Sequence, residues 1–235
     1  RFHPDHRWGT FWSAGAAWLL SQERWFNVDW VDMLKVKASI GSQGNDNIGN
    51  FLYADRYDIS NSDGKVGVAF GAKGTKDITW ETNTNFNAGF EFELFKRLSG
   101  GIEYYKRNTT DMLFSFSVAP SAGYTSYYDN VGDLFNDGIE LELSYDIIKR
   151  RNINWNVFGN ISTLRNRITM LHEDNKTTSY SDLEGNEYFG YTSGSFFIAE
   201  GASMYSWRLK EFAGVDPVTG QSLWYKDVEE MDANG

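Results

Sequence analysis

The 235-residue chain has 17% aromatic residues, 23 glycines, only 3 prolines, no cysteine and a formal net charge of −10. The negative charge argues against nucleic-acid binding, which needs a basic face, and the lack of cysteine excludes disulfides. No apolar run approaches the roughly 18 residues of a membrane helix, although the half-apolar strands of a transmembrane β-barrel would escape that test.

Six segments alternate apolar and polar residues with the two-residue period of a β-strand, which places successive side chains on opposite faces. No segment of comparable length has apolar residues at helical spacing, so the sequence predicts an all-β chain. The expected strands, in chain order, are Arg7–Leu20, Met33–Gly41, Phe86–Phe95, Ser99–Arg107, Gly138–Ile147 and Ile153–Leu164. We expect them to pair antiparallel in sequence order.

In the first expected strand, Trp8 and Trp18 lie ten residues apart on one face. With a rise of about 3.3 Å per residue and a tilt of about 45°, this spacing corresponds to a height of roughly 23 Å. The lipid-facing band of an outer-membrane barrel is about 25 Å tall and has an aromatic girdle at each edge. Trp8 and Trp18 are therefore candidate girdle residues, although two tryptophans in an ordinary core would show the same spacing.

The alternation is clearest in the two hairpins at residues 86–107 and 138–164, where one face is apolar and the other carries carboxylates. The apolar set includes Phe90, Phe92, Ile139 and Leu141, and the acidic set includes Glu91, Glu93, Glu140 and Glu142. The pattern predicts that each set shares one surface of a sheet.

Short and long connections alternate along the chain. The turns near residues 94–99 and 148–152 are tight and basic, whereas the stretches 42–81, 108–137 and 165–207 are long and irregular in composition. Loops of such length are uncommon in ordinary domains. Bacterial outer-membrane barrels have short periplasmic turns and long extracellular loops, so the pattern predicts a barrel segment with its basic turns in the periplasm.

The expected outer loops contain candidate contact residues. Residues 209–225 carry the turn signals of a small hairpin, with Asp216-Pro217 at the start of the turn and Gly220 at its end. The aromatic residues that we expect to face a ligand or partner are Tyr53, Tyr57, Trp80, Tyr124, Tyr127, Tyr128, Tyr188, Phe189, Tyr191, Phe196 and Phe197. Aromatic faces stack on sugar rings and cover apolar peptide side chains; packing of loop on loop is the better explanation for any single ring, but together the rings fit a rim that faces a ligand or partner.

Paired carboxylates leave an enzymatic alternative open. Glu91/Glu93 and Glu140/Glu142 would place their side chains roughly 6–7 Å apart on a strand, and glycoside hydrolases use carboxylate pairs at such distances. A secreted β-sandwich that binds or cuts glycans is thus the rival interpretation, although a polar strand face is favoured. His3 and His6 are weak evidence for a metal site, and the Asn45-Asp46-Asn47 triplet fits a turn better than a calcium site. No catalytic residue, metal or cofactor is therefore assigned.

Five motifs in order resemble the SusC/RagA family of TonB-dependent outer-membrane transporters of Bacteroidetes. They are RWGTFWSAGAAWLLSQERWF at Arg7–Phe26, LKVKASIGSQGNDNIGNF at Leu34–Phe51, ITWETNTNFNAGFEFELFKRLSGGIEYYKRNTTDML at Ile78–Leu113, NVGDLFNDGIELEL at Asn130–Leu143 and EFAGVDPVTGQSLWY at Glu211–Tyr225. Each motif is weak alone, but their order along most of the chain is specific.

The resemblance implies that residues 1–235 are a fragment from the C-terminal half of a roughly 22-stranded barrel. The plug domain and the N-terminal extension of the family would lie outside this segment. The implied function is import of oligosaccharides or peptides across the bacterial outer membrane, without catalysis. The implied partners are a SusD-like surface lipoprotein, the TonB complex acting through the plug, and membrane lipid around the apolar face.

Overall fold

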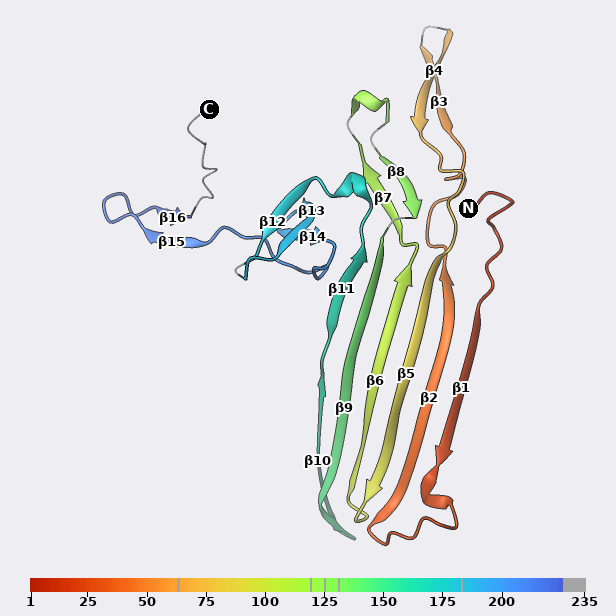
Figure 1. Cartoon of the computed structure of the whole chain (residues 1–235), viewed down its shortest axis with the longest axis vertical. Coiled ribbons are helices and arrows are strands. Elements are labelled where there is room, and N and C mark those ends of the chain that lie inside the picture. The colour runs from red at the N-terminus through yellow and green to blue at the C-terminus, as the bar shows by residue number, and fades with distance from the viewer. Residues whose placement is uncertain (63, 119, 125, 131, 183, 226–235) are drawn as a thin grey trace.

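Six long antiparallel strands form a single sheet in sequence order, and we call this sheet the wall (Figure 1). The computed structural model describes residues 1–225 except 63, 119, 125, 131 and 183; the last ten residues of the expected segment 1–235 therefore lie outside the described part. The strands of the wall are β1 (Trp12–Leu19), β2 (Val31–Asn45), β5 (Glu81–Leu94), β6 (Leu98–Thr110), β9 (Asp133–Arg150) and β10 (Ile153–Ser162). β11 (Arg165–Met170) continues the edge beyond β10 and also pairs with β9. The predicted strand order and antiparallel pairing are confirmed.

The first predicted strand is too long, and four other predicted strands are too short. The first strand begins at Trp12 rather than Arg7, and Leu20 already belongs to a short 3₁₀-helix, η1 (Leu20–Gln22). β2, β5, β6 and β9 extend beyond their predicted ends because the hydrogen-bonded ladder continues through polar residues, as in the Thr82–Thr110 pair. Sequence alternation fades there because both faces of the sheet are polar, although the pairing persists.

The register assigns the two side-chain sets to opposite faces. One cross-strand row contains Trp18, Val36, Phe90, Ile102, Leu141 and Ile161, and it defines the outer face. The neighbouring row contains Ala17, Lys37, Gly89, Glu103, Glu140 and Ser162, and it defines the inner face. The expected separation of the apolar and acidic sets is thus confirmed.

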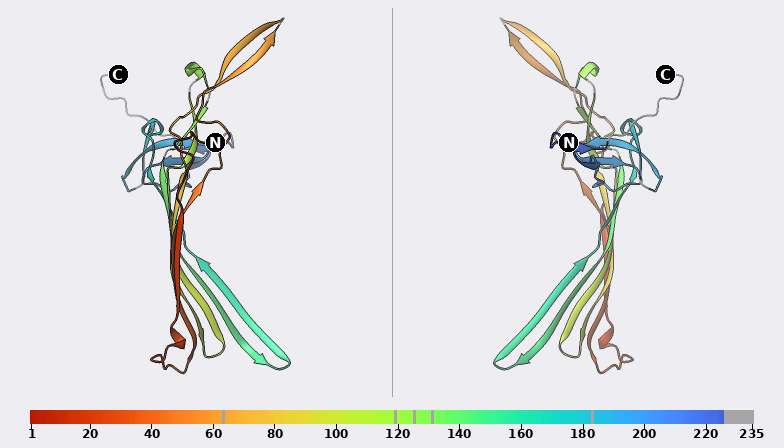
Figure 2. Two further views of the ribbon diagram at one scale, coloured as in Figure 1. Left: turned by 90° about the vertical axis from the view of Figure 1, so that its right-hand side faces the viewer. Right: turned by 90° about the vertical axis from the view of Figure 1, so that its left-hand side faces the viewer.

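The wall is one curved layer when it is seen edge-on (Figure 2). Phe90 and Ile139 on the outer face remain 44% and 46% exposed, so no second sheet among the described residues covers the apolar set. The β-sandwich alternative is therefore wrong about the fold, because a sandwich would bury this face between two sheets.

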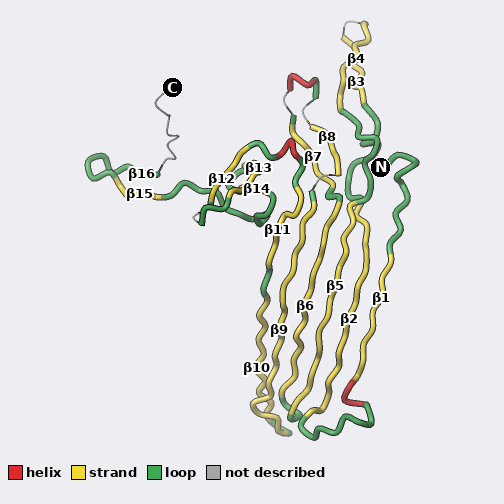
Figure 3. Tube along the Cα trace, viewed as in Figure 1, coloured by secondary structure: helices red, strands yellow, loops and turns green. Residues whose placement is uncertain are grey.

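The two ends of the wall differ. At one end the strands are joined by η1 and by two tight turns, and at the other end lie long connections (Figure 3). We call the connections 46–80, 111–132 and 171–225 the loop layer.

The loop layer is not irregular, which corrects the prediction for these stretches. Its elements are β3 (Arg56–Ser62), β4 (Lys65–Ala72), β7 (Leu113–Ser117), η2 (Pro120–Ala122), β8 (Ser126–Asn130), η3 (Glu173–Asn175), β12 (Thr178–Ser181), β13 (Glu187–Ser193), β14 (Phe196–Ala199), β15 (Phe212–Val215) and β16 (Ser222–Trp224). The predicted hairpin at 209–225 is confirmed as β15–β16, with Asp216 accepting the Val218 N–H at 2.8 Å and Gly220 at a positive φ.

The buried apolar side chains lie in and beneath the loop layer, away from the middle of the wall. They are Phe2, Leu52, Ile78, Leu134, Ile168, Leu171, Phe197 and Ala199. The only helical elements in the described ranges are short 3₁₀ turns, and none of them is long and apolar enough to cross a membrane.

Candidate functional site

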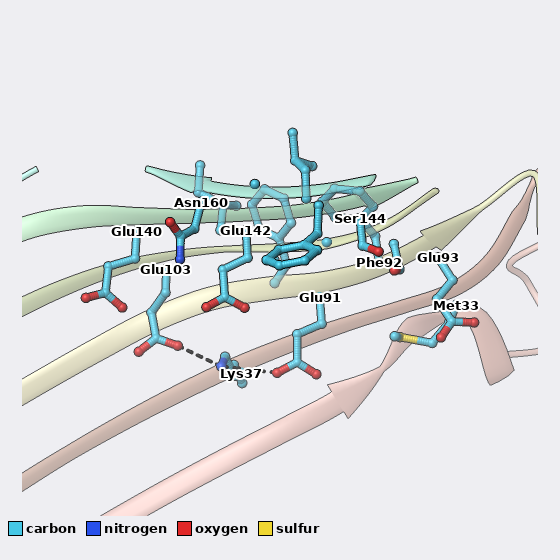
Figure 4. Close-up of a pocket in the computed structure, with 18 residues that line it drawn as sticks. Met33, Lys37, Glu91, Phe92, Glu93, Glu103, Glu140, Glu142, Ser144 and Asn160 are labelled. Carbon is cyan, nitrogen blue, oxygen red and sulfur yellow. Dashed lines mark ion pairs between the residues drawn. The ribbon is translucent and has the colours of Figure 1, made fainter. Parts of the chain in front are cut away.

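The inner face carries a chain of ion pairs across three strands. Lys35 Nζ lies 2.9 Å from a carboxylate oxygen of Glu91, and Lys37 Nζ lies 3.1 Å from Glu91 and 2.7 Å from Glu103 (Figure 4). Lys37 reaches Glu103 across Gly89, which occupies the register position between them and has no side chain. A Cβ at Gly89 would meet the Ile102 carbonyl oxygen at 2.3 Å, so this close strand pairing requires glycine.

These ion pairs border an acidic hollow of about 660 Å³ on the inner face. Glu93, Glu140 and Glu142 line it together with Glu91 and Glu103, so five carboxylates face two lysines along this part of the wall. Glu91 and Glu103 are both in ion pairs with ammonium groups. The arrangement is a charged lining of a wide surface and does not resemble the acid–nucleophile pair of a glycosidase.

A second cluster, in the loop layer, collects aromatic rings around Lys73. The Lys73 ammonium lies 5.7 Å from the ring centroid of Tyr124 and 4.8 Å from that of Tyr127. Phe70 contacts Tyr124 at 5.9 Å between ring centroids, and Tyr57 contacts Phe70 at 5.4 Å. We call these five residues the Lys73 cluster. It joins the β3–β4 hairpin to Tyr124, which lies between β7 and β8, and to Tyr127 in β8.

A hollow of about 550 Å³ opens beside the Lys73 cluster. Asp55, Phe70, Lys73 and Tyr124 line it, and Asp55 accepts the Gly74 N–H at 2.8 Å. The hollow thus presents an ammonium, a carboxylate and ring surfaces within one space. Such groups suit a polar ligand with some apolar surface, because rings supply contact area and charged groups fix orientation.

Asn130 fastens the two loops that form this site. Its side-chain amide accepts the Thr79 N–H at 2.7 Å and donates to the carbonyl oxygens of Thr79 at 3.0 Å and Asp111 at 2.7 Å. The Thr75 hydroxyl also donates to the Tyr128 carbonyl oxygen. The loops 46–80 and 111–132 are therefore joined through hydrogen bonds to backbone groups.

The remaining predicted aromatic residues form two other groups. Trp80 packs against Phe2 and Phe11 at 5.3 and 5.4 Å between ring centroids and donates its indole N–H to the Arg7 carbonyl oxygen at 3.1 Å, and Tyr53 contacts His3 at 5.7 Å. This group anchors the segment that precedes β1.

The third group lies in the β12–β13–β14 sheet. Phe197 is almost fully buried, whereas Phe189 is exposed, and Phe196 packs on Trp207 at 4.4 Å between ring centroids. Burial raises the pKa of the Tyr191 hydroxyl. Tyr188 pairs with Tyr180 across the strands. Ten of the eleven predicted aromatic residues, all but Tyr128, are thus placed in three groups.

Sequence reasoning missed the charged partners of these rings. Lys73 lies among Tyr124 and Tyr127, and the Arg208 guanidinium lies 5.8 Å from the ring centroid of Tyr180 and 5.6 Å from that of Phe197. No periodic pattern marks either residue, because each contact depends on how two loops pack. Lys35 and Lys37 did have a signal, since they alternate with apolar residues in β2.

A family model described as "TonB dependent receptor-like, beta-barrel" matches residues 1–232. The chain belongs to this family. It is 28% identical to TonB-dependent receptor P26 of Formosa agariphila, over 100% of this chain and 23% of that protein. It is also 28% identical to TonB-dependent receptor SusC of Bacteroides thetaiotaomicron, over 84% of this chain and 22% of that protein.

A solved structure described as the RagAB peptide transporter matches with a TM-score of 0.81 and 28% identity, over 96% of this chain and 24% of that chain. The chain therefore spans about a quarter of the length of its relatives. The resemblance to SusC and RagA is confirmed, and the wall is part of an outer-membrane barrel. Its outer face meets lipid, its inner face lines the lumen, and the loop layer is extracellular.

The orientation of the family's barrels in the membrane shows at which membrane surface the exposed tryptophans lie. Trp18 lies on the outer face near the periplasmic end, in edge contact with Trp25 at 6.2 Å between centroids, and its indole N–H donates to Glu23 at 2.8 Å. Trp30 stacks on Phe95 in the same region at 5.5 Å. Trp8 is 88% exposed but precedes β1, so the strand-rise argument does not apply to it and its role in a girdle stays a prediction.

The weak metal candidates have ordinary partners. His3 Nδ1 lies 3.1 Å from Asp5, and His6 Nε2 lies 3.7 Å from Asp77. The Asn45 side chain accepts the Asn47 N–H at 3.0 Å, as expected for a turn. Within the described ranges, no group of three or more His, Asp or Glu side chains could hold a metal ion.

Proposed function

We propose that the full-length protein is a TonB-dependent importer of oligosaccharides or peptides that works with a SusD-like surface lipoprotein. This segment would supply part of the barrel wall, the acidic lining of the lumen and three extracellular loops. Energy would come from the TonB complex acting on a plug domain outside this segment. Catalysis has no part in the proposal.

The contrast between the two ends of the wall carries the proposal. Tight turns close the periplasmic end, whereas the extracellular end holds folded loops with their own buried side chains. Long extracellular loops are common to outer-membrane barrels, but loops with their own buried side chains can hold a fixed surface toward a ligand. The match to a structure described as a peptide transporter supports this interpretation.

Within the loop layer, we assign ligand or partner contact to the surface around the Lys73 cluster. The adjacent hollow offers polar and aromatic groups together, and Tyr57 is exposed at its margin. Tyr128 follows Tyr127 in β8 and is partly exposed as well. The inner-face carboxylates have a different role, because their charges act on a distant ligand only through screened fields.

The test compares two double variants of the full-length receptor with its lipoprotein. Tyr127→Ala with Tyr128→Ala should weaken ligand capture or lipoprotein docking by roughly 1–3 kcal/mol if either ring is an anchor. Glu91→Gln with Glu93→Gln is the control and should change affinity by no more than a few-fold. Calorimetry with defined oligosaccharides and peptides measures the first quantity, and titration with the lipoprotein measures the second.

A large loss from the glutamate pair, with none from the tyrosine pair, would place the working site on the wall and contradict the assignment. Growth of a deletion strain on oligosaccharides or on peptides as the sole nutrient source separately tests the importer function. Unchanged growth and uptake on both would reject it.

A further inference from the structure

Lys73 presents an ammonium group that forms no ion pair with any carboxylate of the described residues. It directly follows β4 and is exposed, and its Nζ atom is positioned by two rings, those of Tyr127 at 4.8 Å and Tyr124 at 5.7 Å to the centroid. Lys35, Lys37 and Lys176, by contrast, each contact a glutamate at 2.7–3.1 Å. The charge of Lys73 is therefore held in place without being neutralised.

The Lys73 ammonium and the Asp55 carboxylate line the same hollow of about 550 Å³, and Phe70 and Tyr124 line it as ring surfaces. No ion pair joins the two charged groups. The Asp55 carboxylate accepts the Gly74 N–H at 2.8 Å, so part of its hydrogen-bonding capacity is already used by the backbone. The ammonium is thus the charged group of the hollow that most lacks a polar partner.

Gly74 fixes the spacing between Lys73 and Asp55. A Cβ at Gly74 would lie 2.3–2.7 Å from three backbone atoms of Ala54. Because backbone atoms cannot yield to such an overlap, only glycine allows the segment after β4 to approach the segment before β3 this closely. The two charged side chains are consequently presented from neighbouring stretches of backbone.

Thr75 ties the same segment to both sides of the hollow. Its N–H donates to the Leu52 carbonyl oxygen at 2.9 Å, and its hydroxyl donates to the Tyr128 carbonyl oxygen next to the ring of Tyr127. The backbone that carries Lys73 is therefore bonded to the backbone that carries the rings. A site that is ordered in this way loses little further freedom when a ligand binds.

The chemistry of the hollow favours a ligand carboxylate. An ammonium group has three donors and no acceptor, and a hydrogen bond from an ammonium to a carboxylate is stronger than one between neutral groups. The rings that flank Lys73 keep water from part of the ammonium, which strengthens its attraction for an opposite charge. Asp55 can accept hydroxyl or N–H groups beside that carboxylate, while Phe70 and Tyr124 cover apolar surface of the ligand.

We propose that Lys73 binds a carboxylate group of the nutrient, so that the receptor selects ligands with a free carboxyl group. The inference rests on the proposed importer function and on the assignment of ligand contact to the Lys73 cluster, and it adds the charge of the ligand. A uronic acid unit of an oligosaccharide and the C-terminus of a peptide both supply this group in its ionised form.

The test uses the full-length receptor with its lipoprotein and two pairs of probes. One pair is an oligogalacturonate and its methyl ester, and the other is an N-acetylated peptide of neutral side chains with a free or an amidated C-terminus. The variants are Lys73→Met, which removes the charge, and Lys73→Arg, which keeps it. Lys76→Met is the matched control, because Lys76 is an exposed lysine of the same loop. Calorimetry at low salt measures affinity, and migration of unheated samples on gels verifies folding.

The wild type should bind the ionised member of one pair about tenfold more tightly than its capped counterpart, because the bond to Lys73 is charge-assisted. Lys73→Met should abolish this preference without changing the affinity for the capped probe, whereas Lys73→Arg and Lys76→Met should retain it. The pair that shows the preference identifies the source of the carboxylate.

Equal affinity of the wild type for both members of each pair would overturn the inference, as would an equal loss in the Lys73→Met and Lys76→Met variants. Either result would leave the importer function standing, since neutral ligands would still be bound. Binding of none of the four probes would also overturn the inference, and growth of the deletion strain then decides separately whether the importer function fails with it.

Discussion

The wall and the loop layer differ in where their apolar side chains lie. On the outer face of the wall, rings and aliphatic groups such as Phe90 remain exposed, although β5, which carries Phe90, is paired on both sides within the sheet. In the loop layer, Ile78 and Phe197 are buried among neighbours from other segments. Lipid covers the apolar side chains on the outer face of the wall. The extracellular loops cover theirs by packing on one another.

The comparison extends to charge. The wall arranges its charged residues in rows fixed by strand register, as with Lys37 between Glu91 and Glu103. The loop layer uses single polar side chains as fasteners, and Asn130 is the clearest case. Disturbing the two regions should therefore have different consequences, and three substitutions test the difference.

The largest effect is expected from Ile78→Ala in the loop layer. The Ile78 side chain is completely buried, so its truncation should destabilise the loops by about 2–5 kcal/mol through lost contacts and a cavity. Faster hydrogen exchange in residues 46–80 and 111–132 would report the loss. The barrel should keep its heat-dependent gel migration. Val66→Ala, in the same loop but exposed, is the matched control and should have little effect.

A somewhat smaller effect is expected from Phe90→Arg in the wall. A cation on the lipid face costs about 2–4 kcal/mol at the bilayer midplane and less toward the interfaces, so folding into lipid vesicles should weaken by up to that amount. Asn87→Arg places the same charge on the inner face of the same strand and should be nearly neutral. Equal losses from both variants would contradict the assignment of faces.

The smallest effect is expected from Asp111→Asn, where the wall meets the loops. Burial, and then the nearby Asp133 carboxylate, raise the pKa of Asp111, and the residue has a φ of 54°, where asparagine is favoured over most residues. A raised carboxyl pKa means that the folded state prefers the protonated form. The penalty is therefore present at neutral pH and disappears as pH falls through the raised pKa toward the ordinary value near 3.9.

Asp111→Asn should stabilise residues 111–132 at neutral pH by less than about 1 kcal/mol and should remove this pH dependence. Hydrogen exchange at neutral and mildly acidic pH, corrected for intrinsic rates, measures both effects. If acidification loosens the wild-type loop more than the variant, the stated cause of the shift is wrong.

Much of the wall could be predicted from the sequence, because its physical rule is local. A two-residue period identifies a strand and assigns Phe90 and Glu91 to opposite faces without knowledge of any partner. Register is not local in this sense. The contact of Lys37 with Glu103 and the row from Lys106 to Arg165 appear only when three or four strands are aligned.

The loop layer was harder to predict for two reasons. The β3–β4 hairpin did carry a signal, since Ile59 and Val68 alternate with polar or small residues around an Asp-Gly turn in the sequence, but the surrounding Gly, Asn and Ser residues obscured it. The Lys73 cluster had no such signal, because its members come from separate loops. That these aromatic residues face a ligand or partner stays a prediction, and their division into three groups depends on tertiary packing.

The amide of Asn130 has an evolutionary consequence. By bonding both backbone groups of Thr79 and the carbonyl of Asp111, one side chain makes two loops a single unit of exchange. A recombination event that replaced only residues 46–80 would change the backbone that the Asn130 amide binds. Replacement of both loops would keep the amide together with its partner backbone. We therefore expect that new ligand preferences in such receptors are inherited as loop pairs, and that chimaeras cut between the two loops reach the cell surface less often than chimaeras cut on either side of both.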